Sequence, residues 1–161
     1  MAKKILVPLD GSKLSERALE QAEIYSRALQ AEVILIRVTD NPLASTPEAG
    51  PAMEKKAAGE TEAQAGGYLD GFVSSLKGKG IKAKSMVQDG PPHSAILGVA
   101  HKEDVDLIVM STHGRTGLSK VVLGSVAEKV LYATRRPVLL VKPERIHKER
   151  VDEAAVIVSM H

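Results

Sequence analysis

Four short apolar runs with helical patterns between them limit the possible folds more than any other feature of this sequence. The runs are near-continuous rather than alternating and are rich in Val, Ile and Leu. They cover residues 5–9 (ILVPL), 33–38 (VILIRV), 105–110 (VDLIVM) and 138–141 (VLLV). Such runs are typical of strands covered on both faces, as in a parallel sheet. A weaker, partly alternating run at residues 83–88 predicts a fifth strand, at an edge of the sheet.

Stripes of apolar residues at helical spacing separate the runs and predict four helices. The predicted helices cover residues 14–29, 65–76, 95–100 and 127–134. Ser12 can cap the first helix, and Gly78 and Gly80 end the second. The third follows Gly90-Pro91-Pro92, and the fourth starts near Gly124-Ser125. The β-α-β-α-β-α-β-α-β order predicts a single doubly wound α/β domain, a five-stranded parallel sheet with helices on both faces. We expect the strand order 3-2-1-4-5, with the first strand central.

Composition excludes several classes of protein. The 22 basic and 20 acidic residues are too balanced to indicate a nucleic-acid partner, and one Phe, three Tyr and no Trp offer few stacking platforms. The chain has no Cys, so it has no disulfide and no thiolate metal site. Its start is a poor secretory signal, and no apolar run approaches the roughly 20 residues that span a bilayer. We expect a soluble, cytoplasmic protein with no membrane partner.

The segment STHGRTGLSKVVLGS, residues 111–125, is unusually long and rich in glycine for a loop after a buried strand. If the first strand is central, this loop faces the turn at residues 8–12 across one crevice, where open α/β sheets bind ligands. Gly114 and Gly117 would let backbone amides approach an anion. Gly124-Ser125 at a helix start would favour a phosphate, with positive charge from Arg115 or Lys120.

Across the crevice, Asp10 could accept hydrogen bonds from ribose hydroxyls or help to hold a metal on the phosphates. The glycine-rich loop, the helix start at Gly124-Ser125 and Asp10 together predict a nucleotide-binding site. Each part also has a purely structural reading: glycines as turn residues, Gly-Ser as a cap and Asp10 as a turn former. Phosphate-loop, dinucleotide-fold, zinc-protease and nucleophile-elbow motifs are absent from the sequence, and its five histidines are scattered.

From Lys3 to Lys142 the chain resembles the universal stress protein family, through KKILVPLDGS, LIRV, THGRTG, LGSVAEKVL and RPVLLVKP. The ATP-binding branch of that family has Gly, two residues, Gly, nine residues, then Gly-Ser or Gly-Thr. Gly114, nine residues, Gly124 and Ser125 match this pattern, whereas Ser111 replaces the first Gly.

The resemblance implies that Asp10 contacts ribose or metal, that the Val38 backbone faces adenine and that the loop glycines hold the phosphates. It implies a homodimer through residues 137–142. The complete candidate site is Pro8, Leu9, Asp10, Val38, Met110, Gly114, Arg115, Gly117, Gly124, Ser125 and Val126, with Asp10 also the metal ligand. The expected ligand is ATP, or AMP or ADP, with Mg²⁺.

We expect an ATP-binding, homodimeric regulator of the stress response with an unknown protein partner. Hydrolysis would be slow at most, because no residue is an obvious general base. Two alternatives stay open: a protein-interaction module with a vestigial site, suggested by Ser111 and VLLV with its tail, and an enzyme acting on an adenylated substrate. Residues 1–143 would form the nucleotide-binding domain and 144–161 a tail, whose apolar run at 154–158 pairs with a partner chain or is frayed. Residues 41–59 would be a flap or a long connection.

Overall fold

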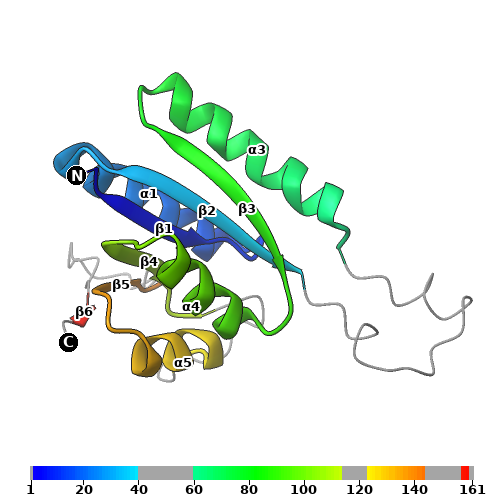
Figure 1. The fold of residues 1–161 in the computed structure, drawn as a ribbon, viewed down its shortest axis with the longest axis vertical. Coiled ribbons are helices and arrows are strands. Elements are labelled where there is room, and N and C mark those ends of the chain that lie inside the picture. Colours follow the sequence, from blue (N-terminus) through cyan, green and yellow to red (C-terminus); the bar gives the residue numbers. More distant parts are fainter. Residues whose placement is uncertain (1, 40–59, 114–122, 144–156, 160–161) are drawn as a thin grey trace, which may run out of the picture.

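The protein is described from a computed structural model, which places residues 2–39, 60–113 and 123–143, and the backbone of 157–159. The segment 41–59 and most of the tail lie outside these described residues. The strands are β1 (Lys4–Pro8), β2 (Glu32–Thr39), β3 (Ala83–Asp89), β4 (Leu107–Ser111), β5 (Val138–Val141) and β6 (Ile157–Ser159). The helices are α1 (Lys13–Leu29), α3 (Glu62–Gly78), α4 (Pro92–Lys102) and α5 (Ser125–Ala133) (Figure 1).

The sheet confirms the predicted strand order. Its order is β3-β2-β1-β4-β5-β6, and the first five strands are parallel. β1 is central, since Leu6 pairs with Ile34 of β2 on one side and with Ile108 of β4 on the other. The strand that the sequence predicts only weakly, β3, lies at the edge as expected.

Helices cover both faces of the sheet, and each face has its own apolar core (Figure 1). α1 and α3 pack on one face, where Leu19 and Leu69 meet Val7 and Leu35 of the strands. α4 and α5 pack on the other face, where Ile96 and Val130 belong to the second core. Because alternate strand residues point to opposite faces, both cores draw on the same strands, and near-continuous apolar runs are required.

Local capping accounts for the helix starts. The Ser12 hydroxyl accepts from the amide of Ser15 at the start of α1, as the sequence predicts. α3 begins with a capping box, in which Thr61 accepts from the Gln64 amide and the Gln64 side chain accepts from the Thr61 amide. Both devices satisfy amides that have no partner within the helix.

The fourth strand begins two residues later than its apolar run. Asp104 has φ +52, and the Val105 amide donates to the carbonyl of Ala100, so these residues still belong to the turn that ends α4. Val105 is fully buried without being in the strand. Its burial in the second core explains why the apolar pattern extends beyond β4.

β6 is an addition to the predicted sheet. It runs antiparallel to β5, with Leu139 opposite Val158, and lies beside β5 in Figure 1. The sequence led us to expect that the apolar run of the tail pairs with a partner chain or is frayed. Residues 157–159 instead pair with β5 of their own chain. Among the described helices, none is both long and apolar enough to cross a membrane.

Candidate functional site

The carboxyl ends of three adjacent parallel strands bring predicted ligand-contacting residues to one edge of the sheet. β1 ends at Pro8, which is in register with Ile36 of β2, and the Leu9 amide donates to the Ile36 carbonyl over 2.9 Å. Val38 lies two residues farther along β2 and is half-buried. β4 runs on the other side of β1, and its Met110 is buried. These are the strand ends at which ligands settle in open α/β sheets.

Asp10 lies in the turn between β1 and α1, and its carboxylate organises that turn. Its Oδ1 accepts hydrogen bonds from both the amide and the hydroxyl of Ser12. The Ser15 hydroxyl donates to the Ser12 carbonyl over 2.8 Å, so the cap residue is held from both sides. Asp10 therefore has a fixed, half-buried position beside the strand ends, and sequence reasoning missed the part that buried Ser15 plays in it.

One backbone hydrogen bond joins the two ends of the long loop after β4. The Gly124 amide donates to the Thr112 carbonyl over 2.7 Å, and the Thr112 amide donates to the Val141 carbonyl over 3.0 Å. Gly124 is the N-cap of α5. The first turn of α5 is thereby set beside the carboxyl end of β4.

The first turn of α5 has backbone donors that no side chain caps. Ser125 is exposed and Val126 is half-buried, and both carry amides. α4 also starts without a side-chain cap, but its first residue is Pro92, which has no amide to offer. Free amides at a helix start, together with the positive end of the helix dipole, favour an anion. α5 therefore has the better start for a phosphate.

The start of the loop has internal contacts of its own. The Ser111 hydroxyl donates to the His113 carbonyl over 2.9 Å, a hydrogen bond that a glycine at this position would lack. Buried Thr112 has its Oγ1 2.9 Å from Nδ1 of His113. Gly114, Arg115 and Gly117 lie outside the described residues, so their predicted contacts with phosphate stay predictions.

Sequence reasoning also missed a polar group beneath the site, formed by Arg37, Glu60, Tyr68 and Glu16. The Arg37 guanidinium donates to Glu60 over 2.6 Å and to the Leu9 carbonyl over 3.2 Å. It lies 5.2 Å from the centre of the Tyr68 ring, whose hydroxyl donates to Glu16 over 3.1 Å. Burial, then the nearby Glu16 carboxylate, raises the pKa of Tyr68 to about 12. The sequence feature that could have indicated this polar group is Arg37 itself, a charged residue inside the otherwise apolar run VILIRV.

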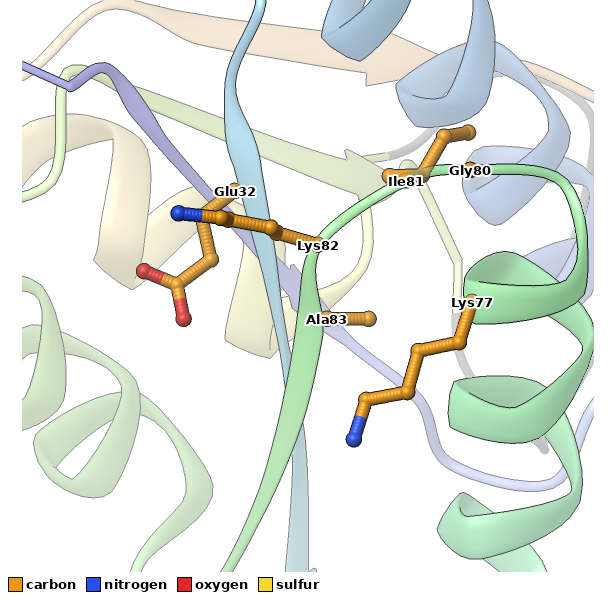
Figure 2. A pocket seen from close by; sticks show the side chains of 6 residues that line it. All are labelled: Glu32, Lys77, Gly80, Ile81, Lys82 and Ala83. Atoms are coloured by element: carbon orange, nitrogen blue, oxygen red, sulfur yellow. The ribbon is translucent and has the colours of Figure 1, made fainter.

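Within residues 2–39, 60–113 and 123–143, no three His, Asp or Glu side chains gather into a metal-binding group. A separate pocket of about 340 Å³ lies at the amino-terminal ends of β2 and β3, which is the opposite end of the strands from the predicted site (Figure 2). Its charged side chains, Glu32, Lys77 and Lys82, are half-buried or exposed, and it is remote from the predicted site.

Comparisons with known proteins agree with the sequence pattern. The model of the universal stress protein family matches residues 1–142. Universal stress protein MJ0577 of Methanocaldococcus jannaschii is 32% identical over 155 residues, which cover 88% of this chain and 96% of that protein. Universal stress protein YxiE of Bacillus subtilis is 30% identical and is covered completely.

Solved structures share the fold. The structure of MJ0577 covers 90% of this chain and 99% of its own, with a TM-score of 0.75 and 34% identity. A universal stress protein solved in complex with cAMP has a TM-score of 0.63 and 23% identity, and it covers 86% of this chain and 96% of its own. The family model covers most of the chain, and the relatives match over nearly their whole lengths. This chain therefore belongs to the universal stress protein family.

Proposed function

We propose that this protein binds ATP with Mg²⁺ at the edge formed by the ends of β1, β2 and β4 and the start of α5. The observation that carries the proposal is the bond between Gly124 and Thr112, which sets an uncapped helix start at the carboxyl end of β4, the strand paired with β1. Family membership supports it, as does the solved relative that holds cAMP, an adenine nucleotide.

Each part of the nucleotide would meet a different group. Pro8, Leu9 and Asp10 would line the ribose side, the Val38 backbone would face adenine and Met110 would close the floor between them. The phosphates would lie against Gly114, Arg115, Gly117 and the start of α5, where Gly124, Ser125 and Val126 supply amides. Asp10 would also help to hold Mg²⁺, which would neutralise phosphate charge.

The residues described at this edge suit such a ligand. The Asp10 carboxylate is an oxygen donor of the kind Mg²⁺ prefers, and α5 starts with amide donors of the kind phosphates prefer. Asp10 is better suited to contact ribose or a metal than to act as a general base, because its Oδ1 already accepts two hydrogen bonds from Ser12. We propose that binding serves regulation in the cytoplasm, with slow hydrolysis at most.

We further propose that two copies pair through residues 137–142. β5 is four apolar, buried residues long and would offer its edge to a second β5. That edge carries β6 in the single chain. The same backbone groups cannot pair with both strands, so the second copy would take the place of β6.

The first experiment is to denature freshly purified protein, identify any released nucleotide by chromatography and titrate the nucleotide-free protein with ATP·Mg²⁺ by calorimetry. Released adenine nucleotide, or binding in the micromolar range, would support the proposal. No nucleotide and no heat would contradict it. That result would favour the protein-interaction module with a vestigial site, which the Ser111 substitution suggests. Turnover that Asp10→Ala abolishes would instead favour an enzyme.

A further inference from the structure

A buried arginine lies directly beneath the proposed adenosine end of the site. Arg37 is 3% exposed, on the face of β2 that points toward α1 and α3. Strand alternation places it in line with Val33 and Leu35, which belong to the core on that face. A guanidinium is a costly occupant of such a position unless its donors are paired.

The contacts of Arg37 converge on the turn that follows β1. Nη1 donates to the Leu9 carbonyl over 3.2 Å, while the Leu9 amide donates to the carbonyl of Ile36. Both backbone polar groups of Leu9 are therefore held by consecutive residues of β2. Leu9 immediately precedes Asp10, and Arg37 immediately precedes Val38, so this hydrogen bond joins the two chain segments that carry the proposed ribose and adenine contacts.

The arginine is itself held in place from two further sides. Glu60, just before α3, accepts from Nε over 2.6 Å. The Tyr68 ring lies under the guanidinium, and the Tyr68 hydroxyl donates to Glu16 of α1. A guanidinium with a carboxylate partner and an aromatic face cannot change its direction easily, so its hydrogen bond to Leu9 has a defined geometry.

Stability alone is a weak explanation for this arrangement. Replacing a buried ion pair by apolar side chains of similar size is often neutral or stabilising. We propose that Arg37 is a positioning residue, which fixes the Leu9–Asp10 backbone and thereby aims the Asp10 carboxylate at the ligand. This inference rests on the proposed function for the identity of the ligand, but its claim about the turn applies to the empty protein as well.

The test compares Arg37→Met with Arg136→Met. Arg136 is a matched control, because it also pairs with a carboxylate, that of Asp104 at 2.7 Å, and precedes β5 at the opposite edge of the sheet. Both substitutions remove one positive charge. We expect Arg37→Met to weaken ATP binding about tenfold, the equivalent of one charge-assisted hydrogen bond, while Arg136→Met leaves it unchanged.

Hydrogen exchange of the ligand-free proteins gives the second measurement. In Arg37→Met the amides of Leu9, Asp10 and Ser12 should exchange faster, while those of Ile5 to Val7 in the same strand keep wild-type rates. Uniformly faster exchange along β1 would indicate a general loss of stability and overturn the inference, as would unchanged exchange at the turn.

The two measurements separate this inference from the proposed function. Wild-type protein that does not bind ATP would contradict the proposed function, while the exchange rates would still decide whether Arg37 holds the turn. Wild-type protein that binds ATP, with Arg37→Met binding equally well, would overturn the positioning role and leave the proposed function standing. Ile81→Ala, a core substitution near the opposite edge, should lower the melting temperature without changing affinity.

Discussion

The amide of Gly124 lies 2.7 Å from the carbonyl oxygen of Thr112, so the chain leaves the sheet and returns to the start of α5 at one point. The bond uses backbone atoms alone and therefore places no demand on the side chain at either position. It makes the start of α5 a fixed part of the sheet edge.

Gly124→Val should strongly weaken nucleotide binding while leaving the fold intact. Gly124 has φ −61 and ψ 150, a conformation open to any residue, and its amide would still donate to Thr112. The new side chain would instead crowd the phosphates. We expect ATP affinity to fall about a hundredfold, roughly 3 kcal/mol, by calorimetry, with an unchanged circular dichroism spectrum. Full affinity in the folded variant would contradict the phosphate assignment.

Asp10→Asn should distinguish the charge of Asp10 from its structural hydrogen bonds. An amide oxygen can still accept from Ser12, so the free energy of unfolding should change by less than about 0.5 kcal/mol. The loss of charge should weaken ATP binding more with Mg²⁺ than without it. Ser12→Ala, which removes the cap, should instead cost about 1 kcal/mol of stability. An Asn variant with the same affinity at every Mg²⁺ concentration would exclude Asp10 as a metal ligand.

Removing residues 144–161 should promote dimerisation. β6 covers the edge of β5 in the single chain, and its removal would expose unpaired backbone groups along a short apolar strand. We expect a lower dissociation constant for the truncated dimer than for the full chain in sedimentation experiments. Val158→Pro in the full chain should act in the same direction, because proline cannot donate to the ladder. Two results would contradict pairing through residues 137–142. One is a truncated chain that stays monomeric, and the other is a full-length dimer that dissociates on truncation.

Tyr68→Phe should change the alkaline stability of the protein. Because the pKa of Tyr68 is raised to about 12, the folded protein keeps this proton when the unfolded chain has already lost it. The contribution to stability is therefore complete below about pH 10 and is lost as the pH rises toward 12. Melting temperatures measured from pH 8.5 to 11.5 should fall less steeply for Tyr68→Phe than for the wild type. Tyr132→Phe, at an exposed position of α5, is the control and should keep the wild-type slope.

Glu103→Gln should weaken the acid dependence of stability. The hydrogen bond from Lys84 lowers the pKa of Glu103, and Lys4 adds to the effect. A carboxyl with a lowered pKa contributes stability above its unfolded pKa, about 4.3, and loses it as the pH falls. Both lysines are partly exposed, so we expect a loss below about 1 kcal/mol at pH 7. Denaturant unfolding at pH 3 to 7 would measure it, and a parallel profile for wild type and variant would contradict it.

The predicted architecture was confirmed because it depends on sequence features, such as apolar runs and helix caps, that involve residues close together in the chain. The apolar run at residues 33–38 indicates a buried strand wherever the chain places it, and Ser12 caps α1 through atoms three residues away. The N-cap position of Gly124 could be predicted for the same reason. The turn at Asp10 and the start of α5 came to one edge because parallel strands all end on the same side.

The partners of Arg37 could not be predicted in the same way. Arg37 is visible in the sequence as a charge within an apolar run, but Leu9 and Glu60 are 28 and 23 residues away. Which atoms a buried guanidinium meets depends on how the crossovers stack α1 and α3 on the sheet. The pairing of β6 with β5 was missed for a related reason, because an edge strand offers backbone groups that any extended segment can use.

The sequence by itself therefore determined the four helices, the five parallel strands and their order in the sheet. Hydrophobic period, capping and strand polarity are properties of neighbouring residues. The tertiary structure alone decided that Arg37 meets the Leu9 carbonyl and that β6 covers β5. Those contacts join residues far apart in the chain, and their formation depends on the packing of whole elements rather than on any local pattern.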